Sequence, residues 1–225
     1  MHKLLLYLTL IFIPANFHNA ESKVPSTFTA PECMQVYNEM ELDDTINYAA
    51  FQQAFAGYNK IKNKRKDILT LIDFTKPSTQ ERLYVIDMKH KKLLYSSHVS
   101  HGRNSGENFA TSFSNKSGSY KSSLGFYVTE NTYQGKNGYS LVLDGLEKGI
   151  NDKAKERAIV IHGAPYSNPS VIKSSGRLGR SLGCPALPPS VSKEIIDTIK
   201  NGSVLYIFAN DQKYLTQSSI LTKIS

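Results

Sequence analysis

The sequence predicts a mainly β, α+β fold with an N-terminal helical segment and one helix close to the C-terminal end. Three observations predict it. Helical periodicity is confined to residues 36–66 and 188–202. Between them run short β-branched and apolar stretches, separated by turn residues. Hydrophobic residues make up 40% of the 225, enough for a sizeable core, which excludes global disorder.

Residues 1–20 have the layout of a secretory signal peptide. His2 and Lys3 precede the apolar run Leu4–Ile13, and cleavage is predicted after Ala20. The apolar run is about half of the roughly 20 residues that cross a bilayer, which disfavours a membrane anchor. The alternative is a buried apolar strand or helix. We expect an exported protein of the periplasm or cell envelope, without stable membrane insertion after cleavage.

The formal net charge is +8, and Lys62–Lys66 is the one dense basic cluster. The absence of a longer Lys/Arg tract argues against nucleic acid as a partner. For an exported protein, an anionic envelope polymer or membrane surface is the expected partner. The alternative for the cluster is the solvated face of a helix.

Residues 21–66 are predicted to form a leader and a helical segment. Residues 21–35 lack periodicity and are expected to be extended, with Cys33 as a structural cysteine. Apolar spacing predicts a helix over 45–63, with Asp43 or Asp44 as its cap. The β domain is then predicted over 67–225.

Apolar runs predict the strands of this domain in order: Asp67–Phe74, Arg82–Met88, Lys92–Ser100, Ser122–Tyr133, Tyr139–Leu146, Ala158–Ala164 and Ser203–Ala209. Residues 101–119 are rich in Gly, Ser and Asn, and a loop of this length is usually functional or mobile. Pro189 and Gly202 bracket the predicted C-terminal helix, whose isoleucines share one side.

Only two cysteines occur, Cys33 and Cys184, and no CxxC pair exists. This count excludes a disulfide-dense scaffold and argues against a Cys-rich zinc site. The two cysteines could form one disulfide in an oxidising compartment. Because that bond would inactivate Cys184 as a nucleophile, free thiols are expected.

Cys184 lies in the sequence GRLGRSLGCPALPP, residues 176–189. A nucleophilic cysteine needs a base, a lowered pKa and donors for an oxyanion. His162, at the end of a predicted strand, is the candidate base. Arg177 and Arg180 would favour a thiolate if they point inward, and the amides of Gly183 and Cys184 are candidate oxyanion donors.

Five separated blocks carry a family resemblance: residues 72–88, 99–106, 118–130, 161–164 (IHGA) and 179–187 (GRSLGCPAL). Together they resemble the L,D-transpeptidase catalytic domain, the YkuD-like family, in its murein L,D-transpeptidase-like bacterial branch. The resemblance spans about residues 72–208. It implies an L,D-transpeptidase-like β-sandwich or barrel, with a helix after the cysteine.

The resemblance also implies a mechanism without a cofactor or metal. The thiolate of Cys184 would attack the amide between the third residue and the terminal D-alanine of a peptidoglycan tetrapeptide stem, giving a thioester. An amine of another stem would resolve it to a cross-link. His162 would act as base and acid, oriented by the carbonyl of Gly163, while Ser181 and the Gly183–Cys184 backbone would line the site.

Two departures from the family pattern concern the substrate contacts. Leu182 occupies the place of a common second histidine, and Pro185 and Ala186 follow the cysteine where a polar or basic residue is usual. Arg180 or Arg177 could then recognise a stem carboxylate, and His101 is a further candidate for substrate binding.

Three other functions stay open. Water as acceptor would give an L,D-carboxypeptidase. Ligation by His101, His162 and Cys184 would give a zinc-dependent envelope hydrolase. The third is a non-catalytic peptidoglycan-binding module. The sequence does not determine the oligomeric state.

Overall fold

The computed structural model describes residues 30–222, so the predicted signal peptide lies outside the described residues. Its helices are α1 (Ala30–Glu39), α2 (Tyr48–Lys60), α3 (Ser170–Ser175), α4 (Pro189–Ile199) and α5 (Gln212–Gln217), with a 3₁₀ turn η1 (Pro165–Ser167). Its strands are β1 (Ile68–Asp73), β2 (Leu83–Asp87), β3 (Lys92–Ser97), β4 (Gly125–Gly135), β5 (Gly138–Gly145), β6 (Val160–Gly163), β7 (Ala186–Leu187) and β8 (Val204–Phe208). The predicted mainly β fold is confirmed. No described helix is both long enough and apolar enough to cross a bilayer.

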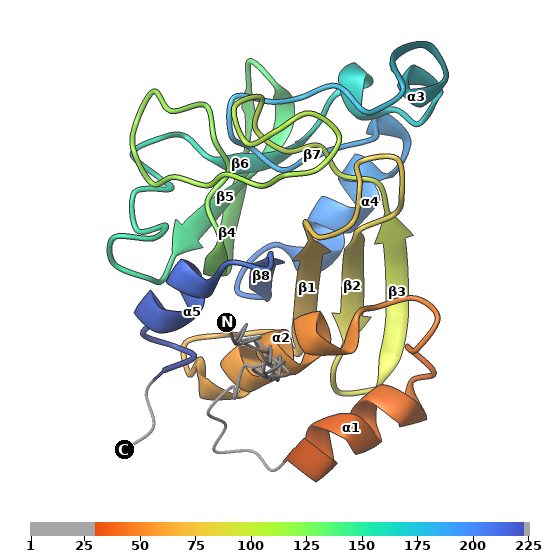
Figure 1. Cartoon of the computed structure of the whole chain (residues 1–225), viewed down its shortest axis with the longest axis vertical. Helices are drawn as coiled ribbons and strands as arrows, with labels where there is room; N and C mark the ends of the chain where they lie inside the picture. Colours follow the sequence, from red (N-terminus) through yellow and green to blue (C-terminus); the bar gives the residue numbers. More distant parts are fainter. Residues whose placement is uncertain (1–29, 223–225) are drawn as a thin grey trace, which may run out of the picture.

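The strands form one eight-stranded sheet in the order β3-β2-β1-β8-β4-β5-β6-β7 (Figure 1). The pairs β1–β8 and β6–β7 are parallel, and the others are antiparallel. Ser100, just beyond β3, pairs with Ala186 of β7 and donates its amide to the Ala186 carbonyl at 2.8 Å. This bridge between the two edge strands makes the sheet a nearly closed, barrel-like structure, as expected.

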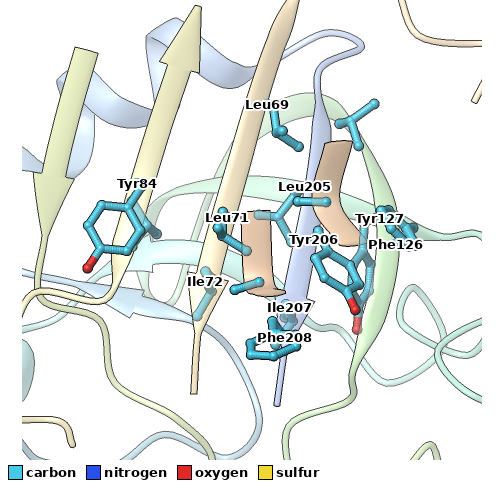
Figure 2. Close-up of a cluster of buried hydrophobic side chains, with 14 of the residues drawn as sticks. Leu69, Leu71, Ile72, Tyr84, Phe126, Tyr127, Leu205, Tyr206, Ile207 and Phe208 are labelled. Carbon is cyan, nitrogen blue, oxygen red and sulfur yellow. The ribbon is translucent and has the colours of Figure 1, made fainter. Parts of the chain in front are cut away.

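Helix α2 covers the sheet at β1 and β8 and shares their hydrophobic core (Figures 1 and 2). Phe126 of β4 stacks on Tyr206 of β8 with ring centroids 4.1 Å apart. A Cβ at Gly57 of α2 would lie 2.1 Å from the Phe126 ring, so this helix needs glycine to approach the sheet closely. The Tyr206 hydroxyl donates to Gln53 of α2 at 2.7 Å. The division between residues 66 and 67 stays a prediction, but packing joins the helix to the β domain.

The N-terminal segment differs from the prediction in two respects. The expected extended leader over 21–35 is wrong at its end, because α1 begins at Ala30 and carries the buried Cys33. The cap of α2 is Asn47, whose side chain accepts from the amides of Ala49 and Ala50, and neither Asp43 nor Asp44 has this role.

The basic cluster Lys62–Lys66 follows the end of α2, so the helix-face interpretation is wrong. Lys64 donates to the carbonyls of Tyr58 and Ile61, both at 3.0 Å, which satisfies acceptors at the helix C-terminus. Part of the cluster therefore stabilises the end of α2.

The segment after β5 contains a fully buried carboxylate, Glu147. It accepts hydrogen bonds from the Phe126 amide and the hydroxyls of Tyr214 and Ser218. Burial raises the Glu147 pKa. These bonds attach α5 and the following chain to β4, which the sequence pattern does not predict.

Candidate active site

The cysteine loop, Ser181–Ala186, begins where the chain turns toward β7. Gly183 has φ +130°, and a Cβ there would lie 2.9 Å from Ile159 Cδ1 and 3.0 Å from Lys121 O. The position therefore requires glycine, both for its backbone conformation and for close approach.

Ser181 closes this loop on itself. Its hydroxyl donates to the Cys184 carbonyl at 2.6 Å and accepts from the Gly183 amide at 3.0 Å. Ser181 is 4% exposed. The structure thus assigns the side chain to holding the loop, and the Gly183 amide is already engaged, contrary to its expected role as an oxyanion donor.

The Cys184 thiol is free and nearly buried, with Sγ 3.6 Å from the Ala158 carbonyl. Burial raises its pKa. Hydrogen bonding from the amides of Val160 and of Cys184 itself, and the charge of Arg157, act in the opposite direction.

His162 lies on β6 and is buried. Its Nδ1 is 3.0 Å from the Gly163 carbonyl. A carbonyl only accepts, so Nδ1 carries the proton and Nε2 presents a lone pair. This is the contact that the family resemblance implies for Gly163. Burial lowers the His162 pKa, which keeps the imidazole neutral near pH 7 and able to accept a proton.

The parallel register brings this base beside the cysteine loop. His162 pairs with Ala186, two residues after Cys184. The amide of Val160, two residues before His162, acts on the Cys184 thiol by hydrogen bonding. Within residues 30–222, no hydrogen bond joins the thiol to the imidazole, because Sγ faces Ala158 instead.

Arg177 and Arg180 do not face the thiol as their sequence positions suggest. Both pair with Glu107, at 2.9 Å and 2.7 Å, and Arg180 also donates to the carbonyls of Arg103 and Gly106. They tie the 103–107 segment to the residues before the cysteine. A role for Arg180 in substrate binding stays a prediction.

His101 is a correction to the predicted site. It is 1% exposed, Arg82 Nη2 donates to its Nδ1 at 2.8 Å, and its Nε2 donates to the Gly106 carbonyl at 3.1 Å. Burial and the Arg82 charge lower its pKa to about 4. Enclosed and with both nitrogens occupied, the imidazole has no surface for substrate and no free nitrogen for zinc.

Sequence reasoning missed Arg157, the cation whose charge acts on the thiol. It directly precedes the predicted strand 158–164 that carries His162. That adjacency, a cation immediately before the strand carrying the base, is the signal that could have found it.

Four cavities of about 260 to 420 Å³ lie elsewhere on the molecule, and neither Cys184 nor His162 lines any of them. Among the described residues, no three His, Cys, Asp or Glu side chains cluster as metal ligands would.

Several solved structures are similar to this chain. An L,D-transpeptidase from Mycobacterium smegmatis is 14% identical, with 64% of this chain and 59% of that chain covered and a TM-score of 0.40. The helical cell shape determining protein Pgp2 from Campylobacter jejuni is 14% identical, with 74% of this chain and 58% of that chain covered and a TM-score of 0.42. An L,D-transpeptidase from Enterococcus faecium is 16% identical, with 66% of this chain and 50% of that chain covered and a TM-score of 0.38. The chain thus spans only about half to three fifths of these three proteins.

No curated protein sequence matches this chain. The sequence model of a protein family described as the L,D-transpeptidase catalytic domain matches residues 42–208, which include β1 to β8 and the whole cysteine loop. The chain therefore belongs to the L,D-transpeptidase catalytic-domain family.

Proposed function

We propose that this protein is a cysteine L,D-transpeptidase that acts on peptidoglycan tetrapeptide stems through a thioester on Cys184. The observation that carries the proposal is the pairing of β6 with β7. It brings His162, with Nδ1 bound to Gly163 and Nε2 free of any hydrogen bond within the described residues, beside the loop of a free cysteine.

Acylation begins with proton transfer from Sγ to His162 Nε2. Rotation about χ1 of Cys184 turns the sulfur from the Ala158 carbonyl toward the imidazole. The thiolate attacks the carbonyl carbon of the amide between the diamino acid and the terminal D-alanine, forming a C–S bond and a tetrahedral oxyanion. As the C–N bond breaks, the imidazolium returns its proton to the leaving amine, so D-alanine departs and a thioester remains.

The donor proposed for the oxyanion is the Cys184 amide. The Gly183 amide donates to Ser181, whereas the Cys184 amide has no other acceptor than its own sulfur among the described residues. Removing one such donor in other enzymes costs roughly 10²- to 10³-fold in rate.

Leu182 gives this site a different rim from the common family pattern. Its side chain is 58% exposed and has no hydrogen-bonding group. We therefore propose apolar contact with the stem at this point. Arg180, half-buried before the cysteine, is proposed for the stem carboxylate.

The acceptor in deacylation decides between transpeptidation and carboxypeptidase activity. An amine of a second stem attacks the thioester carbonyl, loses a proton to His162 and releases the thiolate with a new cross-link. Water in the same position would release a tripeptide stem, as an L,D-carboxypeptidase does.

The test uses the purified protein and a disaccharide-tetrapeptide, with mass spectrometry of protein and products. We expect an acyl-enzyme on the wild type and on Cys33→Ala, and none on Cys184→Ala. Unchanged turnover by Cys184→Ala would refute the proposal. A cross-linked dimer identifies transpeptidation, tripeptide alone identifies hydrolysis, and sacculus binding without turnover by the wild type identifies a binding module.

We also propose that the protein acts outside the cytoplasm, in the periplasm or cell envelope. Support comes from the charge pattern and apolar run of residues 1–20 alone. N-terminal sequencing of the protein from its native envelope should begin at Glu21, and recovery of an uncleaved cytoplasmic chain would contradict export.

A further inference from the structure

A thiol that acts as a nucleophile near neutral pH needs a cation to stabilise its anion, and the molecule offers several candidates. Arg177 and Arg180 both direct their guanidinium groups to the single carboxylate of Glu107. Lys121, close to Gly183 through its backbone, directs its ammonium group to the Ser112 hydroxyl at 2.6 Å. Among the described residues, Arg157 is the cation whose charge lowers the pKa of Cys184.

The Arg157 guanidinium is held entirely by neutral acceptors. Nη1 donates to the Ser114 carbonyl at 2.8 Å and the Ser123 hydroxyl at 2.6 Å. Nη2 donates to the Lys121 carbonyl at 2.6 Å and the Ser119 hydroxyl at 3.4 Å. Arg157 forms no salt bridge within residues 30–222, so no carboxylate there cancels its charge.

Arg157 lies close to Gly183, the residue before Cys184. A Cβ at Gly183 would be 3.4 Å from Arg157 Nη2, and Cys184 follows directly. The thiol in turn faces the carbonyl of Ala158, the residue after Arg157. Ala158 has φ +52°, a left-handed turn that separates the arginine from β6. Arg157 and Ala158, neighbours in the sequence, thus both lie against the cysteine loop.

His162 and Tyr166, two other titratable groups near the thiol, are neutral at pH 7. Burial lowers the His162 pKa, and burial together with the thiol charge raises the Tyr166 pKa to about 12. Tyr127, beside Arg157, also has a pKa raised by burial. Among the described residues, Arg157 thus supplies the positive charge that acts on Cys184.

We propose that Arg157 is a positioning residue that stabilises the Cys184 thiolate by its charge, held toward the loop by the acceptors of residues 114–123. This rests on the proposed function, in which Cys184 is the nucleophile. A purely structural role, as a clamp on residues 114–123, is the competing explanation.

The test measures the pH dependence of Cys184 alkylation by iodoacetamide, with the modified cysteine identified by mass spectrometry. It needs no substrate, so it reports on the thiol even if the transpeptidase assay fails. The variants are Arg157→Gln, which removes the charge but keeps an amide donor, and Arg157→Lys, which keeps the charge. Arg103→Gln is the matched control, because that guanidinium stacks on Tyr120 of the same region at 4.2 Å.

We expect the midpoint of alkylation to rise by roughly one pH unit in Arg157→Gln and to stay near wild type in Arg157→Lys and Arg103→Gln. A folded Arg157→Gln with the wild-type midpoint would overturn the proposal. So would an equal rise in Arg157→Lys, because loss of the guanidinium clamp alone would then explain the shift. If Arg157→Gln does not fold, Arg157→Lys decides. A wild-type midpoint in Arg157→Lys supports the role of charge, and a raised midpoint overturns the proposal.

Discussion

Two buried histidines in this protein have opposite hydrogen-bonding arrangements. His101 is held at both nitrogens, by Arg82 and by the Gly106 carbonyl. His162 is held at Nδ1 alone, by the Gly163 carbonyl. Both are shielded from water, and burial lowers the pKa of each.

The difference teaches how to separate a structural histidine from a candidate base. Proton transfer needs an unprotonated nitrogen with a free lone pair. His101 uses its lone pair on Arg82, so it stabilises the fold. His162 keeps Nε2 available beside the cysteine loop. The two regions are also linked, since the His101 carbonyl accepts the Ser181 amide at 2.9 Å.

The largest effect is expected for His162→Gln. Loss of general base and acid should lower the acylation rate by roughly 10²- to 10⁴-fold. The free energy of unfolding should change by about 1 kcal/mol, the worth of one hydrogen bond. Time-resolved mass spectrometry and urea unfolding measure the two quantities. Acylation within tenfold of wild type would remove the distinction between the two histidines.

Arg82→Met should mainly affect stability. This fully buried guanidinium donates to the carbonyls of Val99 and Lys76 as well as to His101. Leaving these acceptors unsatisfied should lower the free energy of unfolding by about 3 to 5 kcal/mol. Urea unfolding beside the exposed control Arg65→Met checks this. A loss equal to that of the control would show that the His101 region is not a structural anchor.

The pH dependence of stability should reveal His101. Its pKa falls from 6.5 in the unfolded chain to about 4 in the folded protein. Between pH 4 and pH 6.5 the unfolded chain binds more protons than the folded protein. The contribution of His101 to the free energy of unfolding is therefore complete above pH 6.5 and is lost as the pH falls toward 4. This amounts to about 3 kcal/mol.

Urea unfolding between pH 4 and 7 measures this slope. It should flatten in His101→Gln and persist in His90→Gln, whose imidazole is exposed. His162, whose pKa is also lowered, adds to this slope of the free energy of unfolding with pH. Glu147, with its raised pKa, acts against it. An unchanged slope in His101→Gln would contradict the assignment.

The smallest effect is expected for Ser181→Ala. Two hydrogen bonds within the cysteine loop are lost, while the backbone bond to His101 is kept. We expect about 1 to 2 kcal/mol less stability and an acylation rate lowered about tenfold. Acylation abolished as in His162→Gln would instead indicate that the hydroxyl acts on substrate.

Much of the fold could be predicted from local pattern. The strands from β1 to β6, β8 and the helix α4 follow from apolar runs and turn residues. Short elements could not be predicted in this way. The two-residue strand β7 has no periodicity of its own and exists because Ser100 and His162 pair with Ala186 on either side. Helix α5 similarly depends on the buried Glu147.

The candidate site also contains residues that local sequence predicts and residues that it does not. Cys184, His162 and Gly163 were identifiable from IHGA and GRSLGCPAL, because neighbouring residues form a motif. His101 was misassigned and Arg157 was missed, because their partners Arg82 and Cys184 are distant from them in sequence. A serine hydroxyl or a guanidinium has the same appearance in a sequence whether it meets substrate, a carbonyl or a carboxylate.

Local sequence patterns predicted the mainly β class, the family resemblance and the candidate cysteine and histidine, because periodicity and motifs depend on neighbouring residues. The tertiary structure reveals which histidine keeps a free nitrogen, which arginines pair with Glu107 and which arginine acts on the thiol. Those outcomes depend on burial and hydrogen-bond partners, and only the folded chain brings Glu107 to Arg180, Arg82 to His101 and Arg157 to the cysteine loop.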